Sequence, residues 1–388
     1  MEYRPIPADR SDEFRRLVSY AFSPESGPEI DDEERPHPGE RYGLFEGETL
    51  LCVCRHYDLT VRVRGEDRRV AGLSAVASPP EHRQRGYVAE LLKESLADYR
   101  ERGIDLSLLW PFEHAFYRRY GWGTVNEYAR YATAPETLAS AAGPDRGRFQ
   151  RIEADEWASL DAIHRAHGDR ADLSIRRTEE WWRRRVFERW SETPYVHRWD
   201  EEGEPRAYLA YAVDDDGERT LRVTDMAYTD HAALRQLLRF LSVHRSQIDR
   251  ISLRAPPDFP LFEMVDAPGE IECTLHAGPM LRLVDVARAL ERLETSDGFE
   301  RRMTISVSDP SAPWNDGTFS LSGEGVAREP TETAAVETTV ETLSQLYAGY
   351  RPLETLERVG DLRIHDESVR PAMEALFPAR RTYLGEHF

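Results

Sequence analysis

Lysine is almost missing from this chain of 388 residues, because Lys93 is the only one among 51 basic residues and the others are arginines. Acidic residues number 71, which leaves a formal net charge of −20. No basic stripe stands out, so a nucleic-acid partner is not expected. A dense carboxylate surface with arginine in place of lysine is typical of a salt-in halophile, where a Debye length of about 3 Å at molar salt screens the self-repulsion. The same charge leaves open a second interpretation, an acidic surface that attracts cationic substrates.

Long apolar runs and cysteines are also scarce. No run approaches the ~18–20 residues that a membrane helix needs, and the opening MEYRPIPADR lacks the basic and apolar segments of a signal peptide. We therefore expect a cytoplasmic protein with no membrane partner. Of the three cysteines, Cys52 and Cys54 would point to one face of a strand. No second Cys/His cluster lies nearby to complete a zinc tetrahedron, so we expect small buried thiols and no metal.

The length allows two or three domains. In the first region, residues 1–137, the apolar spacing predicts a helix, antiparallel strands, a second helix that Gly103 stops, and a further strand. These elements cover Ser11–Phe22, Glu48–Ala77 with a turn at 65–67, a stretch from Tyr87, and Ile104–Trp110. This order is typical of an α/β fold with a mixed (α+β) sheet.

The segment Leu138–Arg148 is small, polar and rich in glycine and proline, which is typical of a linker. The second region, 149–275, repeats the architecture of the first, and an internal duplication would explain this. Its predicted helices and strands are Glu153–Ala166, Glu179–Trp190, Ala207–Val213, Leu221–Ala227, His231–Val243 and Ile251–Arg254. The third region, 277–388, carries predicted elements at Val284–Leu293, Met303–Val307 and Thr318–Leu321, then late helices, and no helical pattern over Thr382–Phe388.

The most informative stretch is LSAVASPPEHRQRGYVA, residues 73–89. A strand ends before Pro79, a short loop follows, and a helix begins near Tyr87. Unpaired N–H groups at such a helix N-terminus bind phosphate, and Gly86 lets the backbone approach a pyrophosphate because it has no Cβ. Arg83 and Arg85 add positive charge. Taken alone, the tetrapeptide Arg83–Gly86 is a weak signal, and a helix-capping turn in an arginine-rich protein explains it better than a phosphate site does.

After the next strand the chain continues FEHAFYRRYGW, residues 112–122. Strand, R-x-x-G loop, helix, strand and then F-Y-x-x-x-G-aromatic resembles the GCN5-related N-acetyltransferase (GNAT) superfamily. The spacing is most similar to its enhanced-intracellular-survival (Eis) group. That resemblance implies two tandem GNAT lobes, the second degenerate, followed by a sterol-carrier-like α+β domain, which AGPMLRLVDVARALE, PWNDGTFSL and LSQLYAG match. With the composition, it also predicts a haloarchaeal source.

The resemblance implies an acetyl-CoA-dependent amine N-acetyltransferase and assigns residues to its site. Val76, Ala77 and Ser78 would be the strand edge that pairs with pantetheine. Phe112 and Glu113 would lie beside the thioester. The turn around the pyrophosphate would consist of Gln84, Arg85, Gly86, Tyr87, Val88 and Ala89. Acetyl-CoA would be the co-substrate, a small-molecule amine the acceptor, and a homo-oligomer, a hexamer in the group it resembles, the assembly.

Tyr117 would be the general acid, because a phenol with an unperturbed pKa of about 10 is protonated at neutral pH and can donate to a leaving thiolate. Packing within the core is the other explanation of this tyrosine. The base would be the carboxylate at the end of the chain, on Phe388. Its unperturbed pKa of about 3.3–3.7 is low for a base, so desolvation would have to raise it, or it would orient the amine and pass on its proton. His114 is the rival base.

Several alternatives stay open at this stage. The acceptor is an aminoglycoside, a polyamine-like amine or a protein lysine, although His387 stands where an acidic residue would help to bind a polycation. The acidic run 31–34 is a solvated loop or a lure for cations, and Trp181, Trp182 and Trp190 are core residues or line the acceptor pocket. The alternative function is a non-catalytic protein that binds a sterol or lipid in its third region. The second lobe, with Tyr228–Asp230 in place of a phosphate turn, should be silent.

Overall fold

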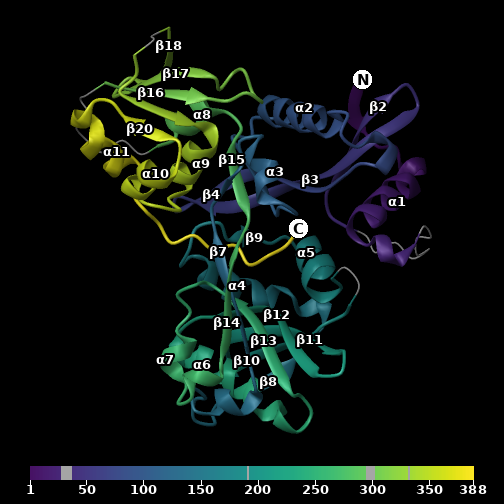
Figure 1. Cartoon of the computed structure of the whole chain (residues 1–388). Helices are drawn as coiled ribbons and strands as arrows, with labels where there is room; N and C mark the ends of the chain where they lie inside the picture. The colour runs from purple at the N-terminus through teal and green to yellow at the C-terminus, as the bar shows by residue number, and fades with distance from the viewer. Residues whose placement is uncertain (28–36, 190–191, 294–301, 331–332) are drawn as a thin grey trace.

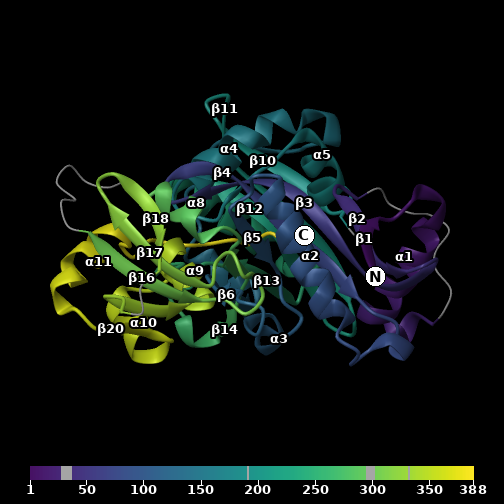
Figure 2. The ribbon, with the colours of Figure 1, turned by 90° about the horizontal axis from the view of Figure 1, so that it is seen from above.

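The computed structural model describes residues 1–27, 37–189, 192–293, 302–330 and 333–388. The acidic run 31–34 and Trp190 lie outside these described residues. Within them, the strands form three sheets, one for each of three units. The units meet around the C-terminus, which lies at the centre of the molecule in both views (Figures 1 and 2).

The first unit is built on the sheet with the order β1-β2-β3-β4-β5-β15-β6, and β9 also pairs with β3. Its strands are β1 Glu2–Pro5, β2 Glu40–Glu46, β3 Thr49–Val63, β4 Glu66–Ala77, β5 Leu106–Leu109, β6 Gly123–Thr124, β9 Ile175–Arg176 and β15 Met280–Leu283. Its helices are α1 Ser11–Phe22, α2 Tyr87–Glu101 and α3 His114–Arg118. The apolar stripe of α2 is buried against the sheet, with Leu91, Leu92, Leu96 and Tyr99 fully covered. The helix–hairpin–helix–strand order expected from the sequence is confirmed.

The second unit has the sheet order β14-β7-β13-β12-β11-β10-β8. Its strands are β7 Glu127–Thr133, β8 Arg148–Arg151, β10 Tyr195–Glu201, β11 Glu204–Asp215, β12 Arg219–Tyr228, β13 Arg250–Ala255 and β14 Glu272–Ala277. Its helices are α4 Ala158–Gly168, α5 Glu179–Trp181 with a π-helical turn over Trp182–Phe187, α6 His231–Ser242 and α7 Leu261–Met264. The run β11–β12–α6–β13 repeats β3–β4–α2–β5, as an internal duplication predicts.

The two sheets exchange one strand each. β7 directly follows the first unit in sequence but pairs antiparallel with β13 of the second sheet. β15 follows the second unit and pairs antiparallel with β5 of the first. The three sheets therefore do not coincide with the ranges 1–137, 149–275 and 277–388 that were predicted as domains. The expected linker is only partly packed, because Leu138 is fully buried and Gly147 lies against Trp199, while residues 144–148 are exposed.

The third unit has the sheet order β18-β17-β16-β19-β20. Its strands are β16 Met303–Ser308, β17 Gly317–Ser322, β18 Gly325–Glu329, β19 Val336–Thr339 and β20 Leu362–Ile364, and its helices are α8 Val286–Glu291, α9 Val340–Ala348, α10 Leu353–Val359 and α11 Arg370–Leu376. Within the described residues, no helix is long and apolar enough to cross a membrane. Part of the first unit's apolar core forms one cluster with the core of the third unit, and this cluster includes Phe388.

The last seven residues connect all three units. Tyr383 N donates to Asp172 O of the second unit, at 2.9 Å. Asn126 Nδ2 donates to Leu384 O at 3.4 Å. The absence of a helical pattern after residue 381 agrees with this extended course, which carries Phe388 from the third unit to the first sheet (Figure 1).

Candidate active site

An opening lies between β4 and β5 of the first sheet. Their parallel pairing covers only Ala71–Leu73 with Ser107–Leu109, while β4 runs on to Ala77. The pairing of β3 with β4 shifts register between Val53 and Arg55, and Ala75 adopts a φ of +51°. This bulge bends β4 away from β5. Among the described strands, none pairs on the β5 side with the edge that includes Val76 and Ala77, with Ser78 after it. Such an edge can pair with an extended ligand.

The turn between β4 and α2 opens to solvent. Gln84 and Gly86 have positive φ angles of +60° and +82°, and Gly86 caps α2 without a side-chain hydrogen bond. Gln84, Arg85 and Gly86 are exposed, while Tyr87, Val88 and Ala89 are half-buried in the first turn. Among the backbone hydrogen bonds of this turn, that of Glu90 N to Gly86 O (3.1 Å) begins the helix, so the N–H groups before it have no intrahelical acceptor.

The space around Gly86 is open. A Cβ on Gly86 would meet no atom within 4 Å. Arg83 ties the turn to the end of β4, because its Nε donates to Ser78 O at 3.2 Å. The predicted phosphate-binding residues thus surround one open, donor-rich turn beside the free edge of β4.

Tyr117 lies on α3, at the far side of the opening, with 4% of its surface exposed. Its ring contacts the rings of Phe112 and Phe116 at centroid distances of 5.4 and 5.1 Å. It shares an apolar cluster with Val76, and Val88 packs against the same cluster. Burial raises the pKa of Tyr117 above its usual value, so its phenol is protonated at neutral pH. Tyr117 can therefore pack in the core and also act as a general acid.

Phe112 and Glu113 precede Tyr117 at the start of α3. Phe112 is 60% exposed, unusual for an aromatic side chain whose neighbours are packed. Glu113 is also exposed and occupies the N-cap position of α3. An exposed phenylalanine beside a buried tyrosine leaves an apolar surface that a bound ligand can cover.

Phe388 is 95% buried at the point where β4 and β5 separate, since its exposed fraction is 5%. Ser74 Oγ donates to an oxygen of Phe388 at 2.8 Å. The ring packs edge-on against Tyr57, at 5.7 Å, and a Cβ on Gly72 would stand 3.0 Å from it. The last residue of the chain thus lies two residues along β4 from Val76.

The two residues before Phe388 are firmly held. Trp110 Nε1 donates to Glu386 O at 2.5 Å, and its rings stack on His387 at 3.8 Å. Arg177 Nε and Trp181 Nε1 donate to one carboxylate oxygen of Glu386, at 3.0 and 2.7 Å. Arg185 Nη2 donates to His387 O at 2.5 Å. Trp181 therefore helps to position the C-terminus from the second unit, and Trp182 is fully buried in the core.

The residues that hold the C-terminus were not predicted from the sequence. Ser74 lies inside the predicted strand and Trp110 at the end of another, without a motif. Arg177 and Arg185 are two among many arginines, and they contact the C-terminus across more than 200 residues. Of the residues that hold the C-terminus, only Trp181 was a candidate from the sequence, as a residue that could line the acceptor pocket.

His114, the alternative base, contacts a different segment of the chain. His114 Nε2 lies 3.1 Å from Gly278 O, so the ring connects α3 to the segment before β15. No group of three or more His, Cys, Asp or Glu residues that could hold a metal occurs in the described part of the chain. Cys52 and Cys54 are buried in the first unit, as expected.

The second unit lacks the corresponding turn. Only Thr229 and Asp230 separate β12 from α6. Asp230 caps α6 by accepting from Ala233 N at 2.8 Å, and it also pairs with Arg206. A carboxylate therefore occupies the helix N-terminus where a phosphate would bind, in agreement with a degenerate second lobe.

Comparisons with known proteins agree with this fold. Residues 2–125 and 173–283 each match a family model described as an acetyltransferase (GNAT) domain, and residues 286–385 match a sterol carrier protein domain. An uncharacterized N-acetyltransferase of Streptomyces griseus is 29% identical, over 95% of this chain and 94% of the relative. The N-acetyltransferase Eis of Mycobacterium tuberculosis is 28% identical, over 87% of this chain and 85% of the relative.

Solved structures show the same fold. A probable N-acyltransferase from Enterococcus faecalis superposes with a TM-score of 0.85 at 23% identity, covering 100% of this chain and 99% of that one. Eis1 from Mycobacterium abscessus superposes with a TM-score of 0.77 at 25% identity, covering 100% of both chains.

Proposed function

We propose that the chain transfers the acetyl group of acetyl-CoA to an amine, and that it does so in the first domain. The two segments that match acetyltransferase (GNAT) domains, which precede the sterol carrier protein domain, and the similarity to Eis support this proposal. The observation that carries this proposal is the opening between β4 and β5, which has a free strand edge, a donor-rich turn, and both Tyr117 and Phe388 at its sides. GNAT acetyltransferases use acetyl-CoA, and this opening fits its pantetheine arm and pyrophosphate.

Acetyl-CoA supplies an acetyl thioester. In our proposal, Val76, Ala77 and Ser78 pair with its extended arm, and the Gln84–Ala89 turn holds its phosphates. Phe112 covers the apolar side of the site and Glu113 borders it. The terminal carboxylate of Phe388, held by Ser74, accepts a proton from the attacking amine, directly or through water. Tyr117 Oη donates its proton to the leaving thiolate.

The acceptor follows from the surroundings of Phe388. The Glu386 carboxylate is already bonded to Arg177 and Trp181, and Arg185 holds the carbonyl of His387. Burial, Arg254 and Arg189 lower the pKa of His387 to about 3, so this ring is neutral. We therefore propose that the preferred acceptors carry one or two amino groups. Aminoglycosides and polyamines, which are strongly cationic, and protein lysines come after them. A screen that follows release of the CoA thiol with amines of increasing charge tests this, and a preference for the most cationic acceptors would contradict it.

A sterol- or lipid-binding protein with an inactive acetyltransferase scaffold is the second candidate. Thermal shift with acetyl-CoA against a fatty acid or a sterol separates the two. We expect stabilisation by acetyl-CoA, because binding to the folded state raises the melting temperature. Stabilisation by the lipid alone would favour the alternative.

The phosphate turn provides a prediction with a matched control. Replacing Gly86 with Val should raise the KM for acetyl-CoA by at least about tenfold, because the Cβ blocks the backbone approach to the pyrophosphate. Gly203 has a nearly identical φ of +86° and equally open surroundings, but it lies in the β10–β11 turn. Gly203→Val should lower the melting temperature to a similar extent while leaving the KM unchanged. An unchanged KM in Gly86→Val would mean that the turn is only a helix cap.

We also propose that the charge of −20 is an adaptation to high salt. The named relatives come from Streptomyces and Mycobacterium, so the haloarchaeal habitat rests on composition alone. A melting temperature that rises steadily with KCl would support it, and one that is flat or falls would contradict it. A homo-oligomer, hexameric as in the Eis group, is a further proposal that light scattering would test.

A further inference from the structure

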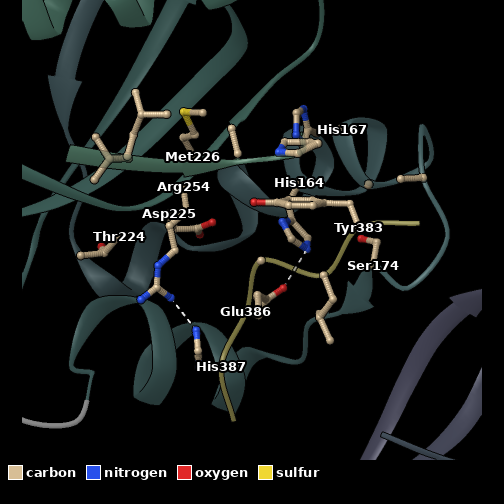
Figure 3. Close-up of a pocket in the computed structure, with 18 of the residues that line it drawn as sticks. His164, His167, Ser174, Thr224, Asp225, Met226, Arg254, Tyr383, Glu386 and His387 are labelled. Carbon is tan, nitrogen blue, oxygen red and sulfur yellow. Dashed lines mark hydrogen bonds and ion pairs between the residues drawn. The ribbon is translucent and has the colours of Figure 1, made fainter. Parts of the chain in front are cut away.

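A second opening lies in the second domain, between β12 and β13 (Figure 3). Their parallel pairing covers only Thr220–Arg222 with Arg250–Ser252, after which the strands separate. A cavity of about 300 Å³ occupies the gap, and α4 and the C-terminal segment form part of its lining. It corresponds in topology to the opening between β4 and β5, but Asp230 occupies the N-terminus of the helix that would hold a pyrophosphate.

The lining of this cavity is rich in arginine, although the protein as a whole is acidic. The carboxylates in the described part of its lining are Asp225 and Glu386, and both are bonded to Arg177, at 2.7 and 3.0 Å. The arginines are Arg130, Arg170, Arg177, Arg185, Arg189, Arg222, Arg254 and Arg381. Carboxylates outside the cavity pair with three of them, since Glu192 binds Arg189 and Arg222, and Asp258 binds Arg381.

Three of these arginines, Arg130, Arg170 and Arg254, have no carboxylate within 4.0 Å among the described residues. Arg254 is the deepest of them and donates to His387 Nε2 (Figure 3). That ring is neutral, so it gives a hydrogen bond but no countercharge. Burial also lowers the pKa of His167, another histidine of the lining, to about 4, so this ring is neutral as well.

The positive charges of Arg130 and Arg254 lie on neighbouring strands of the sheet and repel each other. They stand directly opposite in the antiparallel pairing of β7 and β13. Like charges in this position are destabilising. The pKa of Arg254 is lowered by burial and, among its charged neighbours, by Arg130. Arg130 is exposed and Arg254 is half-buried, so solvent screens part of this repulsion, and an anion bound between the two guanidinium groups would remove more of it.

We propose that this cavity binds a small anion, a phosphate or carboxylate compound, with Arg130, Arg170 and Arg254 as its counterions. Guanidinium groups bind such oxyanions through two parallel hydrogen bonds. The volume is at the lower end for a small-molecule site. Because Arg254 also bonds to His387, the bound anion is connected to the residue next to Phe388, and it helps to hold the end of the chain in place.

Titration with inorganic phosphate and with citrate, at constant ionic strength in chloride, tests this site by calorimetry and thermal shift. We expect saturable binding of at least one of the two, and the preferred probe tells a phosphate from a polycarboxylate site. Arg254→Gln and Arg130→Gln should each weaken it by at least about tenfold, as the loss of a hydrogen bond between charged groups predicts. Arg245→Gln, which removes an exposed charge from the same domain, should leave the affinity unchanged.

Two further readouts keep the test independent of the acetyl-transfer proposal. Without ligand, Arg130→Gln should melt at the same temperature as the wild type or higher, because it removes the repulsion with Arg254. Saturating acetyl-CoA should not displace the anion, because the two openings lie in different sheets. Absence of saturable binding of both probes, or equal binding by the Arg130, Arg254 and Arg245 variants, would overturn the proposal.

Discussion

Converting the terminal carboxylate of Phe388 into an amide is expected to lower kcat/KM by at least about 100-fold, because a proton acceptor or relay is lost and a misplacement of about 1 Å can already cost that much. A C-terminal tag should do the same harm, since it replaces the carboxylate and places chain where the last residue is 95% buried. The comparison needs the untagged chain, an N-terminally tagged chain, a C-terminally tagged chain and a chain that ends in a carboxamide.

The carboxamide is the sharpest variant, because it keeps the ring of Phe388 against Tyr57 and removes only the charge. Deletion of Phe388 is less informative, since loss of a buried phenylalanine ring costs about 3–5 kcal/mol of stability and moves the carboxylate to His387. Phe388→Leu retains the carboxylate and should lose less activity than the amide. Full activity of the carboxamide, with an unchanged melting temperature, would show that this carboxylate is structural and would return His114 to consideration.

Replacing Tyr117 with Phe should lower kcat by about 10²–10⁴-fold and leave the KM for acetyl-CoA nearly unchanged, because it removes one proton donor and keeps the packing. Tyr120 is the matched control. It lies in the same aromatic group, 5.3 Å from Phe116, but is less buried. Tyr120→Phe should reduce kcat by much less. Equal losses at both positions, or no loss at Tyr117, would refute the assignment.

The pH profile adds an independent check on Tyr117. Burial raises the pKa of this phenol above its usual value of about 10. The protonated acid therefore persists below that pH, and kcat should not fall between about pH 8 and 10 through loss of the tyrosine proton. A basic limb within that range that disappears in Tyr117→Phe would contradict this environment.

The sequence predicted local features well and long-range ones poorly. The bounds of α1, the β3–β4 hairpin and the start of α2 at Tyr87 follow from apolar spacing and from Gly86, which are local signals. The exchange of β7 and β15 was not predictable in this way. β15 has only four residues, and its partner strand β5 lies more than 160 residues earlier in the chain, so no spacing within a window shows the pairing.

The same difference applies to the two openings. The turn of the first is continuous in sequence, and its residues could be named one by one. The supports of the C-terminus, such as Trp110 and Arg185, and the opposed pair Arg130 and Arg254 come together only through the fold. In a chain where nearly every cation is arginine, composition does not distinguish an arginine that has a carboxylate partner from one that has none.

A crystal structure of the chain with bound CoA would test the central claim most directly. The account predicts the pyrophosphate at the backbone of Gln84–Ala89, the pantetheine along Val76–Ser78, and the thiol between Tyr117 Oη and the carboxylate of Phe388. CoA in the cavity between β12 and β13, or bound with its thiol away from both residues, would contradict it.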